Sequence, residues 1–278
     1  MHELPLVFFT VLAQGTVGLF LVLASLLLFN QKPERKRVLS RFMWLVLALL
    51  GIAGALAMTH LGQPLRALNV VFGLEHFSPL SLEIATTGLF GGAVFVYAAM
   101  TRFDILAKLH KLVLAGAMGL GVMLVLAIAN VYTLATVPTW DSFWTVFQFV
   151  LTAFVVGLPM AALVLRAGAT GLGVYQKNTD RALATLGFIA LGVALAAYPL
   201  YVFWLGQVDA SLLSRFDYHA TLILTRGALL SAGLGLWIIA ATRGNNTSVV
   251  VSAVSTVLVL VAEVCGRIFF YDTHMLAL

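Results

Sequence analysis

Residues 6–29 read LVFFTVLAQGTVGLFLVLASLLLF, a run of 24 residues without a charged side chain. A helix of this length, rising about 1.5 Å per residue, covers the ~30 Å hydrocarbon layer of a bilayer. The preceding residues, Met1-His2-Glu3-Leu4-Pro5, lack the positive charge of a secretory signal peptide, and the run is longer than the apolar segment of one. The run therefore predicts a first transmembrane helix.

Seven more apolar runs of similar length follow along the sequence. Of its 278 residues, 62% are hydrophobic and 10% are charged, whereas soluble domains carry about 25% charged residues. The mean hydropathy is +1.04. We therefore expect an all-α polytopic membrane protein, a single transmembrane domain over residues 1–278 in which a bundle of eight helices crosses the bilayer. The expected spans are 6–29, 42–59, 81–101, 112–133, 143–165, 182–205, 220–241 and 248–270.

Lysine and arginine are concentrated in alternate connections between these spans. The first, third, fifth and seventh connections hold twelve of the sixteen Lys and Arg residues against three acidic residues, a net charge of +9, and the opposite side carries −4. Basic connections stay in the cytoplasm, so both termini are expected to be periplasmic and the protein to lie in a bacterial inner membrane. The tryptophans agree, because indoles favour the membrane interface and all five lie near expected helix ends: Trp44, Trp140, Trp144, Trp204 and Trp237.

Several function classes are excluded by composition. The single cysteine, Cys265, cannot form an internal disulfide, a four-cysteine zinc site or an iron–sulfur cluster held by this protein alone. The histidines are too scattered in depth to suggest paired haem ligands, so we expect no haem and no metal. The basic connections are short, which argues against a cytosolic catalytic domain, and their charge needs no nucleic-acid partner because it serves to anchor the protein. The longer connections after the second and sixth spans place the function on the outer side.

Two ionisable residues flank the long second connection. His60 ends the second span, and Glu83 lies just inside the third, after a Ser78-Pro79 pair typical of a helix start. The Glu83 carboxylate could simply be stabilised by the helix dipole, but Glu83 lies beyond the first turn, where that effect is strong. We therefore prefer the interpretation that Glu83 is a buried carboxylate that accepts a proton. Together with the His60 imidazole it could serve a ligand that releases two electrons and two protons, such as a quinol. Arg66 follows the Gly62-Gln63-Pro64 turn and could extend to the membrane interface or dock a partner or a head group.

A second group of ionisable residues lies in the last two spans. Glu263 and Arg267 have i, i+4 spacing in the favourable order, and Arg226 is expected at a similar depth to Glu263. We interpret them as a structural ion pair in which Glu263 neutralises Arg226 or Arg267. In the third span, Gly88 and Gly92 have the small-xxx-small spacing that predicts close helix packing.

The stretch His60-Leu-Gly-Gln-Pro-Leu-Arg66-Ala-Leu-Asn69, followed by Leu80-Ser-Leu-Glu83-Ile84, resembles the signature of the DmsC family. The two ends of the sequence are also similar to that family, at residues 2–6 and at residues 263–275. Members of this family are membrane anchor subunits of dimethyl-sulfoxide-reductase-type molybdoenzymes. The resemblance therefore extends over the whole sequence.

This resemblance implies eight helices with both termini in the periplasm and no haem. It implies oxidation of menaquinol near the periplasmic face, with Glu83 and His60 at the quinol site and Arg66 in the same motif. The electrons would pass to an iron–sulfur subunit and then to a molybdopterin catalytic subunit, both docked on the periplasmic side. We expect the quinol to enter from the bilayer into a pocket among the second, third, seventh and eighth spans.

Three alternatives stay open at this point. A polysulfide-reductase-type anchor would do the same work without the His60–Glu83 motif. A secondary transporter would bind its substrate near the midplane between repeated halves, but the charged residues here are shallow and no internal repeat is evident. A purely structural anchor would leave the quinol site to another subunit.

Overall fold

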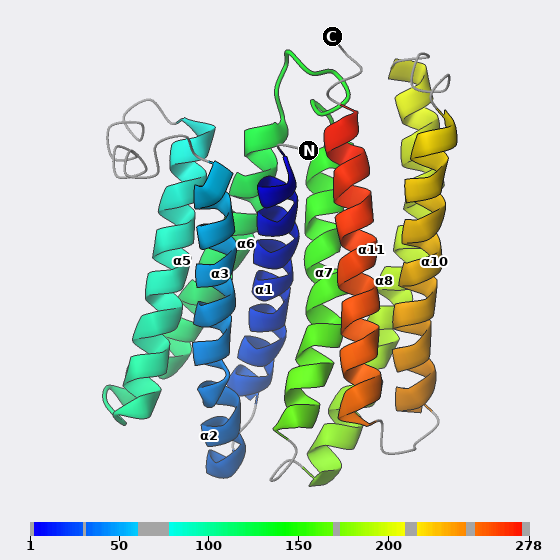
Figure 1. Ribbon diagram of the computed structural model, residues 1–278. Helices are drawn as coiled ribbons and strands as arrows, with labels where there is room; N and C mark the ends of the chain where they lie inside the picture. The colour runs from blue at the N-terminus through cyan, green and yellow to red at the C-terminus, as the bar shows by residue number, and fades with distance from the viewer. Residues whose placement is uncertain are drawn as a thin grey trace.

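The computed structural model describes residues 3–29, 32–60, 78–168, 173–208, 216–242 and 248–273. Within them the protein forms long helices that run side by side and alternate in direction, so that α1 begins and α11 ends at the same end of the bundle (Figure 1). The helices are α1 Leu4–Phe29, α2 Pro33–Arg41, α3 Met43–His60, α5 Pro79–Arg102, the 3-10 turn η2 Ala107–Leu109, α6 His110–Tyr132, α7 Phe143–Ala167, α8 Gly173–Val208, α10 Phe216–Thr242 and α11 Val249–Asp272.

A long apolar helix forms in each of the eight stretches expected to span the membrane. Eight helices in the described ranges are long and apolar enough to cross a membrane, and their bounds agree with the predicted ones to within four residues, except that α8 begins at Gly173 instead of residue 182. The helix α2, in the first basic connection, was not anticipated. Its first turn contains Pro33 and the acidic Glu34, and its last turn contains the basic Arg41. Proline and acidic residues are favoured at the start of a helix and basic residues at its end.

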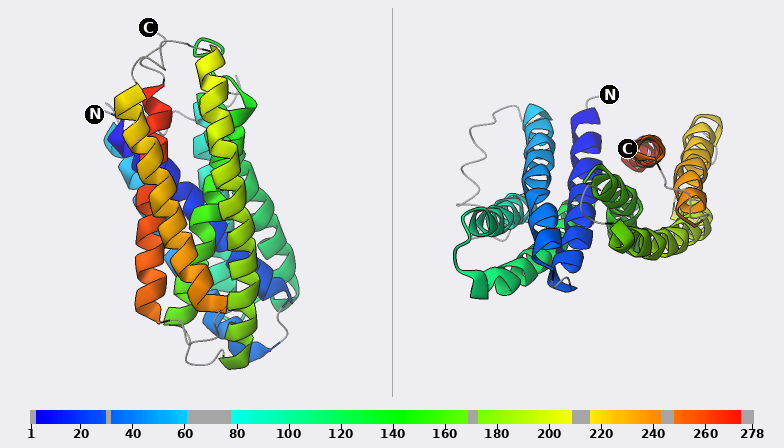
Figure 2. Two further views of the ribbon diagram at one scale, coloured as in Figure 1. Left: turned by 90° about the vertical axis from the view of Figure 1, so that its right-hand side faces the viewer. Right: turned by 90° about the horizontal axis from the view of Figure 1, so that it is seen from below.

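The bundle consists of two groups of four long helices. In the first group α1 packs against α3 and α6, and α5 packs against α3 and α6; in the second, α8 and α11 each pack against both α7 and α10. The groups meet chiefly where α1 crosses α7, with α11 also against α1, and Figure 2 shows α1 and α7 between the two groups. In the most apolar window of α1 and α7, 72% and 83% of residues are buried, against 39% or less in the other spans.

Glycines allow the backbones of α1 and α7 to touch. A Cβ atom added to Gly18 would lie 1.9 Å from the carbonyl oxygen of Ala153, and one added to Gly157 would lie 2.5 Å from the backbone of Gly18. Since two backbones cannot give way as a flexible side chain can, this crossing requires glycine. The expectation for Gly88 and Gly92 is wrong: no described atom lies within 4 Å of a Cβ built at either residue. Their spacing was suitable, but no neighbouring helix covers them.

Two of the tryptophans lie near helix ends, as expected, but are buried in the protein instead of facing the membrane interface. Trp237 is 1% exposed and covers Gly187 of α8. Trp140, 7% exposed, donates from Nε1 to the carbonyl oxygen of Phe270 at 2.9 Å and to Thr273 Oγ1 at 3.2 Å. Through these bonds the connection between α6 and α7 is fastened to the end of α11.

The close crossing of α1 and α7 at Gly18 predicts that a larger residue there destabilises the protein. Gly18→Ala should destabilise the protein by about 1–3 kcal/mol, the usual cost of overpacking, because α1 and α7 must separate. Stability would be measured as the midpoint of unfolding in mixed detergent micelles. The matched control is Gly119→Ala in α6, where a Cβ meets no described atom within 4 Å; alanine should be neutral or stabilising there by up to about 1 kcal/mol through helix propensity. Equal effects at both glycines would contradict the close crossing.

Candidate functional site

The helix ends place His60 and Glu83 at the same end of the bundle. His60 is the last residue of α3, and Glu83 is the fifth residue of α5, about 6 Å along the helix from its start. The two helices pack against each other. Ser78 occupies the N-cap position of α5, without a capping hydrogen bond from its side chain, and Pro79 is the first residue of the helix, as the sequence predicts. His60 is exposed, and Arg66 lies outside the described residues.

The Glu83 side chain is enclosed in the bundle. It is 7% exposed, and within the described ranges no hydrogen bond or ion pair joins its carboxylate to another residue. The Tyr132 hydroxyl, on the last residue of α6, is close enough for a charge on Glu83 to act on it. That hydroxyl accepts a hydrogen bond of 2.6 Å from Tyr271 of α11. A buried carboxylate without a partner is costly in a membrane protein and marks a candidate functional group.

Arg226 and Glu263 form a buried ion pair between α10 and α11. The guanidinium donates to Glu263 Oε1 from Nε at 3.1 Å and from Nη2 at 2.9 Å, and the two residues are 4% and 2% exposed. The other carboxylate oxygen accepts a 2.5 Å hydrogen bond from Thr152 of α7. Arg226 also lies over the Tyr198 ring, 4.2 Å from its centroid. The carboxylate therefore connects α7, α10 and α11.

Arg267 takes a different position from its neighbour in sequence. Its Nη2 donates to Gln14 Oε1 of α1 at 2.8 Å and to Thr152 Oγ1 at 3.2 Å. The guanidinium carbon lies 3.6 Å from the centroid of the Phe149 ring. Of the two arginines that the sequence offers to Glu263, the structure pairs Arg226 with it, and Arg267 instead bridges α1 and α7.

The cluster formed by Gln14, Thr152, Arg226, Glu263 and Arg267 holds two cations and one carboxylate. A net positive charge in an apolar interior needs compensation, which the rings of Phe149 and Tyr198 supply, because the negative face of an aromatic ring attracts a cation. Gln14, Thr152 and both rings were not predicted from the sequence. A glutamine inside an otherwise apolar span is the one signal that could have found them.

The sequence-based prediction of a single pocket among the second, third, seventh and eighth spans is wrong. The corresponding helices are α3, α5, α10 and α11, and Figure 2 shows α3 and α5 on one side of α1 and α7, with α10 on the other. The sequence indicates how deep a residue lies in the membrane, but depth does not determine lateral position in a bundle. The candidate site is therefore the α3–α5 end with Glu83, and the Arg226–Glu263 pair lies apart from it.

The buried Arg226–Glu263 ion pair predicts that loss of the Glu263 charge destabilises the protein. Glu263→Gln should destabilise the protein by about 3–5 kcal/mol, because it leaves the Arg226 guanidinium buried without its counter-charge. Unfolding in mixed micelles measures the loss. The control is Glu34→Gln on exposed α2, which should change the free energy of unfolding by less than about 0.5 kcal/mol. A stable Glu263→Gln protein would mean that the ion pair does not hold α10 to α11.

Comparison with known proteins identifies the family. Residues 1–273 match the family described as "DMSO reductase anchor subunit (DmsC)". The protein belongs to this family. It is 34% identical over 286 residues to the C subunit of the anaerobic dimethyl sulfoxide reductase of Escherichia coli, an alignment that includes 99% of this sequence and 96% of that protein. It is 32% identical to the anaerobic dimethyl sulfoxide reductase subunit YnfH of the same organism, over 99% of this sequence and 95% of the relative.

A third relative, the C subunit of the anaerobic dimethyl sulfoxide reductase of Haemophilus influenzae, is 31% identical, over 99% of this sequence and 96% of that protein. The resemblance seen in the sequence is thereby confirmed. Membership of the DmsC family, with eight apolar helices, makes the protein a multi-pass bacterial inner-membrane protein and the anchor subunit of an oxidoreductase complex with catalytic and electron-transfer partners.

Proposed function

We propose that this anchor subunit binds and oxidises menaquinol at the end of the bundle where α3 ends and α5 begins. The electrons pass to an iron–sulfur subunit docked over that end, and from there to a molybdopterin subunit. The observation that carries the proposal is the buried Glu83 carboxylate, which has no partner in the described part of the protein. The likeness of His60–Asn69 and Leu80–Ile84 to the DmsC signature supports it.

The chemistry fits the two side chains. Oxidation of a quinol to a quinone breaks two O–H bonds and yields two protons and two electrons. Glu83 accepts one proton, because a carboxylate within hydrogen-bond reach of the quinol hydroxyl serves as general base. His60 hydrogen-bonds the other oxygen, orients the ring and takes the second proton, which it passes to the solvent at the exposed end of α3. The electrons leave one at a time to the cluster of the partner subunit.

Access from the lipid is supported by the surface around the site. Met58 near the end of α3 and Leu80 at the start of α5 are 45% and 48% exposed. Large apolar side chains exposed on a membrane-spanning helix face the acyl chains. A quinol with an isoprenoid tail can therefore approach Glu83 without leaving the hydrocarbon layer.

The charge asymmetry supports a periplasmic location of this site. The basic connections lie at the opposite end of the bundle from His60 and Glu83, and the positive-inside rule assigns that basic end to the cytoplasm. We therefore propose that the termini and the partner subunits lie on the periplasmic side. Protons released at Glu83 then leave to the same side as the reduced product, so turnover creates little membrane potential.

Glu83→Gln tests the proton-accepting role. In the assembled complex the variant should lose quinol-dependent reductase activity by about 100-fold or more, the usual contribution of a general base. Reduction driven by a soluble viologen dye, which delivers electrons to the partner subunits directly, should not change. The control is Asp141→Asn at the same end of the bundle, an exposed carboxylate. Full quinol-dependent activity in Glu83→Gln would reject the role proposed for Glu83.

His60→Ala tests the orienting role. Loss of one hydrogen bond to the quinol should raise KM by about 10-fold, with a smaller effect on kcat, because proton transfer to Glu83 persists. Steady-state kinetics with a water-soluble quinol provide both constants. Thr59→Ala is the matched control, since the Thr59 hydroxyl donates to the carbonyl oxygen of Leu56 in its own helix. An unchanged KM in His60→Ala would place His60 outside the quinol site.

A further inference from the structure

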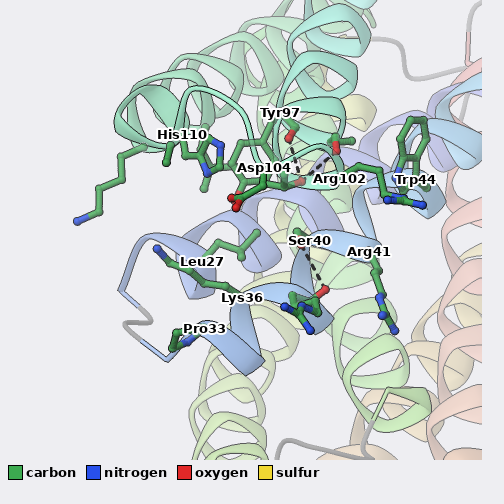
Figure 3. A pocket seen from close by; sticks show the side chains of 16 residues that line it. Leu27, Pro33, Lys36, Ser40, Arg41, Trp44, Tyr97, Arg102, Asp104 and His110 are labelled. Carbon is green, nitrogen blue, oxygen red and sulfur yellow. Dashed lines mark hydrogen bonds between the residues drawn. The ribbon is translucent and has the colours of Figure 1, made fainter.

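A cavity of about 880 Å³ lies at the basic end of the bundle, opposite to His60 and Glu83. Figure 3 shows it between α2, which carries Lys36 and Arg41, and the region where α5 ends at Arg102 and α6 begins at His110, with Asp104 in the connection between them. The end of α1 closes it at Leu27. No residue of the proposed quinol site lines this cavity.

The rim of the cavity is strongly cationic. Five Lys and Arg residues line it against one carboxylate, Asp104, and in the described ranges no ion pair joins any of the five to an acidic residue. Their side chains are exposed. Cations gathered from three helices repel one another, and a bound anion relieves that repulsion. The five residues are Lys36, Arg37, Arg41, Arg102 and Lys111.

Two structural details orient these cations. Arg37 and Arg41 are four residues apart on α2, so they lie on one face of the helix, and Lys111 lies in the first turn of α6, where the helix dipole also favours an anion. On the α6 side, His110 Nε2 lies 2.9 Å from the carbonyl oxygen of Ile105. An imidazole that donates to this carbonyl is held against the α5–α6 connection.

The floor of the cavity is apolar and aromatic. Leu27, Tyr97 and Leu114 are buried beneath the cations. At the edge stands Trp44, 43% exposed, whose ring makes an edge contact with Phe95 of α5 at 5.8 Å between centroids. Along the membrane-facing side of α3 and α5, large apolar side chains such as Ile52 and Phe95 are 53% and 52% exposed. The site is therefore amphipathic, with charge at the membrane boundary and apolar surface toward the bilayer.

We infer that this cavity binds the headgroup phosphate of an anionic phospholipid, with the acyl chains lying along α3 and α5. A free phosphate ion would use the cations but not the adjoining apolar surface, and a zwitterionic lipid would bring its own cation into a cationic rim. Basic pockets between transmembrane helices at the cytoplasmic side suit anionic headgroups for this reason. The bound lipid bridges α2 to the α5–α6 connection.

The test uses the full-length protein in its complex, purified in a mild non-ionic detergent and titrated with lipid under native mass spectrometry. Phosphatidylglycerol should bind at least about 10-fold more tightly than phosphatidylcholine. Arg37→Gln/Arg102→Gln removes one cation from each wall and should weaken phosphatidylglycerol binding by about 10-fold or more. The matched control, Lys108→Gln/Arg181→Gln, removes two exposed charges from the same end outside the cavity and should leave binding unchanged.

Further arms separate the outcomes. Arg37→Lys/Arg102→Lys keeps both charges and should retain most of the binding, which distinguishes lost charge from a lost fold. Inorganic phosphate at millimolar concentration should not displace the lipid. Three results would overturn the inference: equal binding of phosphatidylglycerol and phosphatidylcholine, equal weakening in the control pair, or binding of inorganic phosphate as tight as that of the lipid.

Discussion

The structure depends on one constraint, that a charged pair lies inside an apolar bundle. Hydrophobic burial drives the association of transmembrane helices only weakly, since lipid is as apolar as leucine, so close packing and polar contacts must hold them. Glu263 meets this need by accepting from Arg226 and from Thr152. The same carboxylate thus fixes α7, α10 and α11, and any rearrangement of these helices would leave charge unpaired in a medium that cannot solvate it.

Arg267 extends this constraint across the boundary between the two four-helix groups. Its hydrogen bond to Gln14 reaches α1, which crosses α7 where Gly18 and Gly157 allow the backbones to touch. Contact at the glycines is purely steric, and contact at Arg267 is polar, so the two restrict different motions. Sliding of α1 along α7 would break the hydrogen bond, whereas separation of the helices would lose the glycine packing. Together, the glycine crossing and the Arg267 hydrogen bond hold in place the first helix group (α1, α3, α5 and α6), which carries the candidate site.

The sequence was sufficient for the spans and the family but not for the lateral arrangement. Apolar length reports directly on membrane crossing, and the ends of α3 and α5, including Ser78, Pro79 and His60, were placed correctly. The depth of charged residues is also readable, but Glu83 and the Arg226–Glu263 pair, all expected toward the outer side, proved to lie in different helix groups. Gly88 and Gly92 had the spacing of a packing motif without a helix against them, because the spacing defines a helix face and not its neighbour.

The two ends of the molecule are chemically opposite, and the difference follows from what each must contact. At the end with His60 and Glu83, a carboxylate is enclosed without a counter-charge in the described residues, a condition that favours exchange of protons over binding of anions. At the other end, cations surround an apolar floor, a condition that favours a permanently charged amphiphile. A neutral quinol gains nothing from five cations, and an anionic lipid would be repelled by Glu83. On the proposed quinol site and the inferred lipid site, each end of the bundle selects its own membrane ligand by electrostatics, and the intervening helices keep the two ends apart.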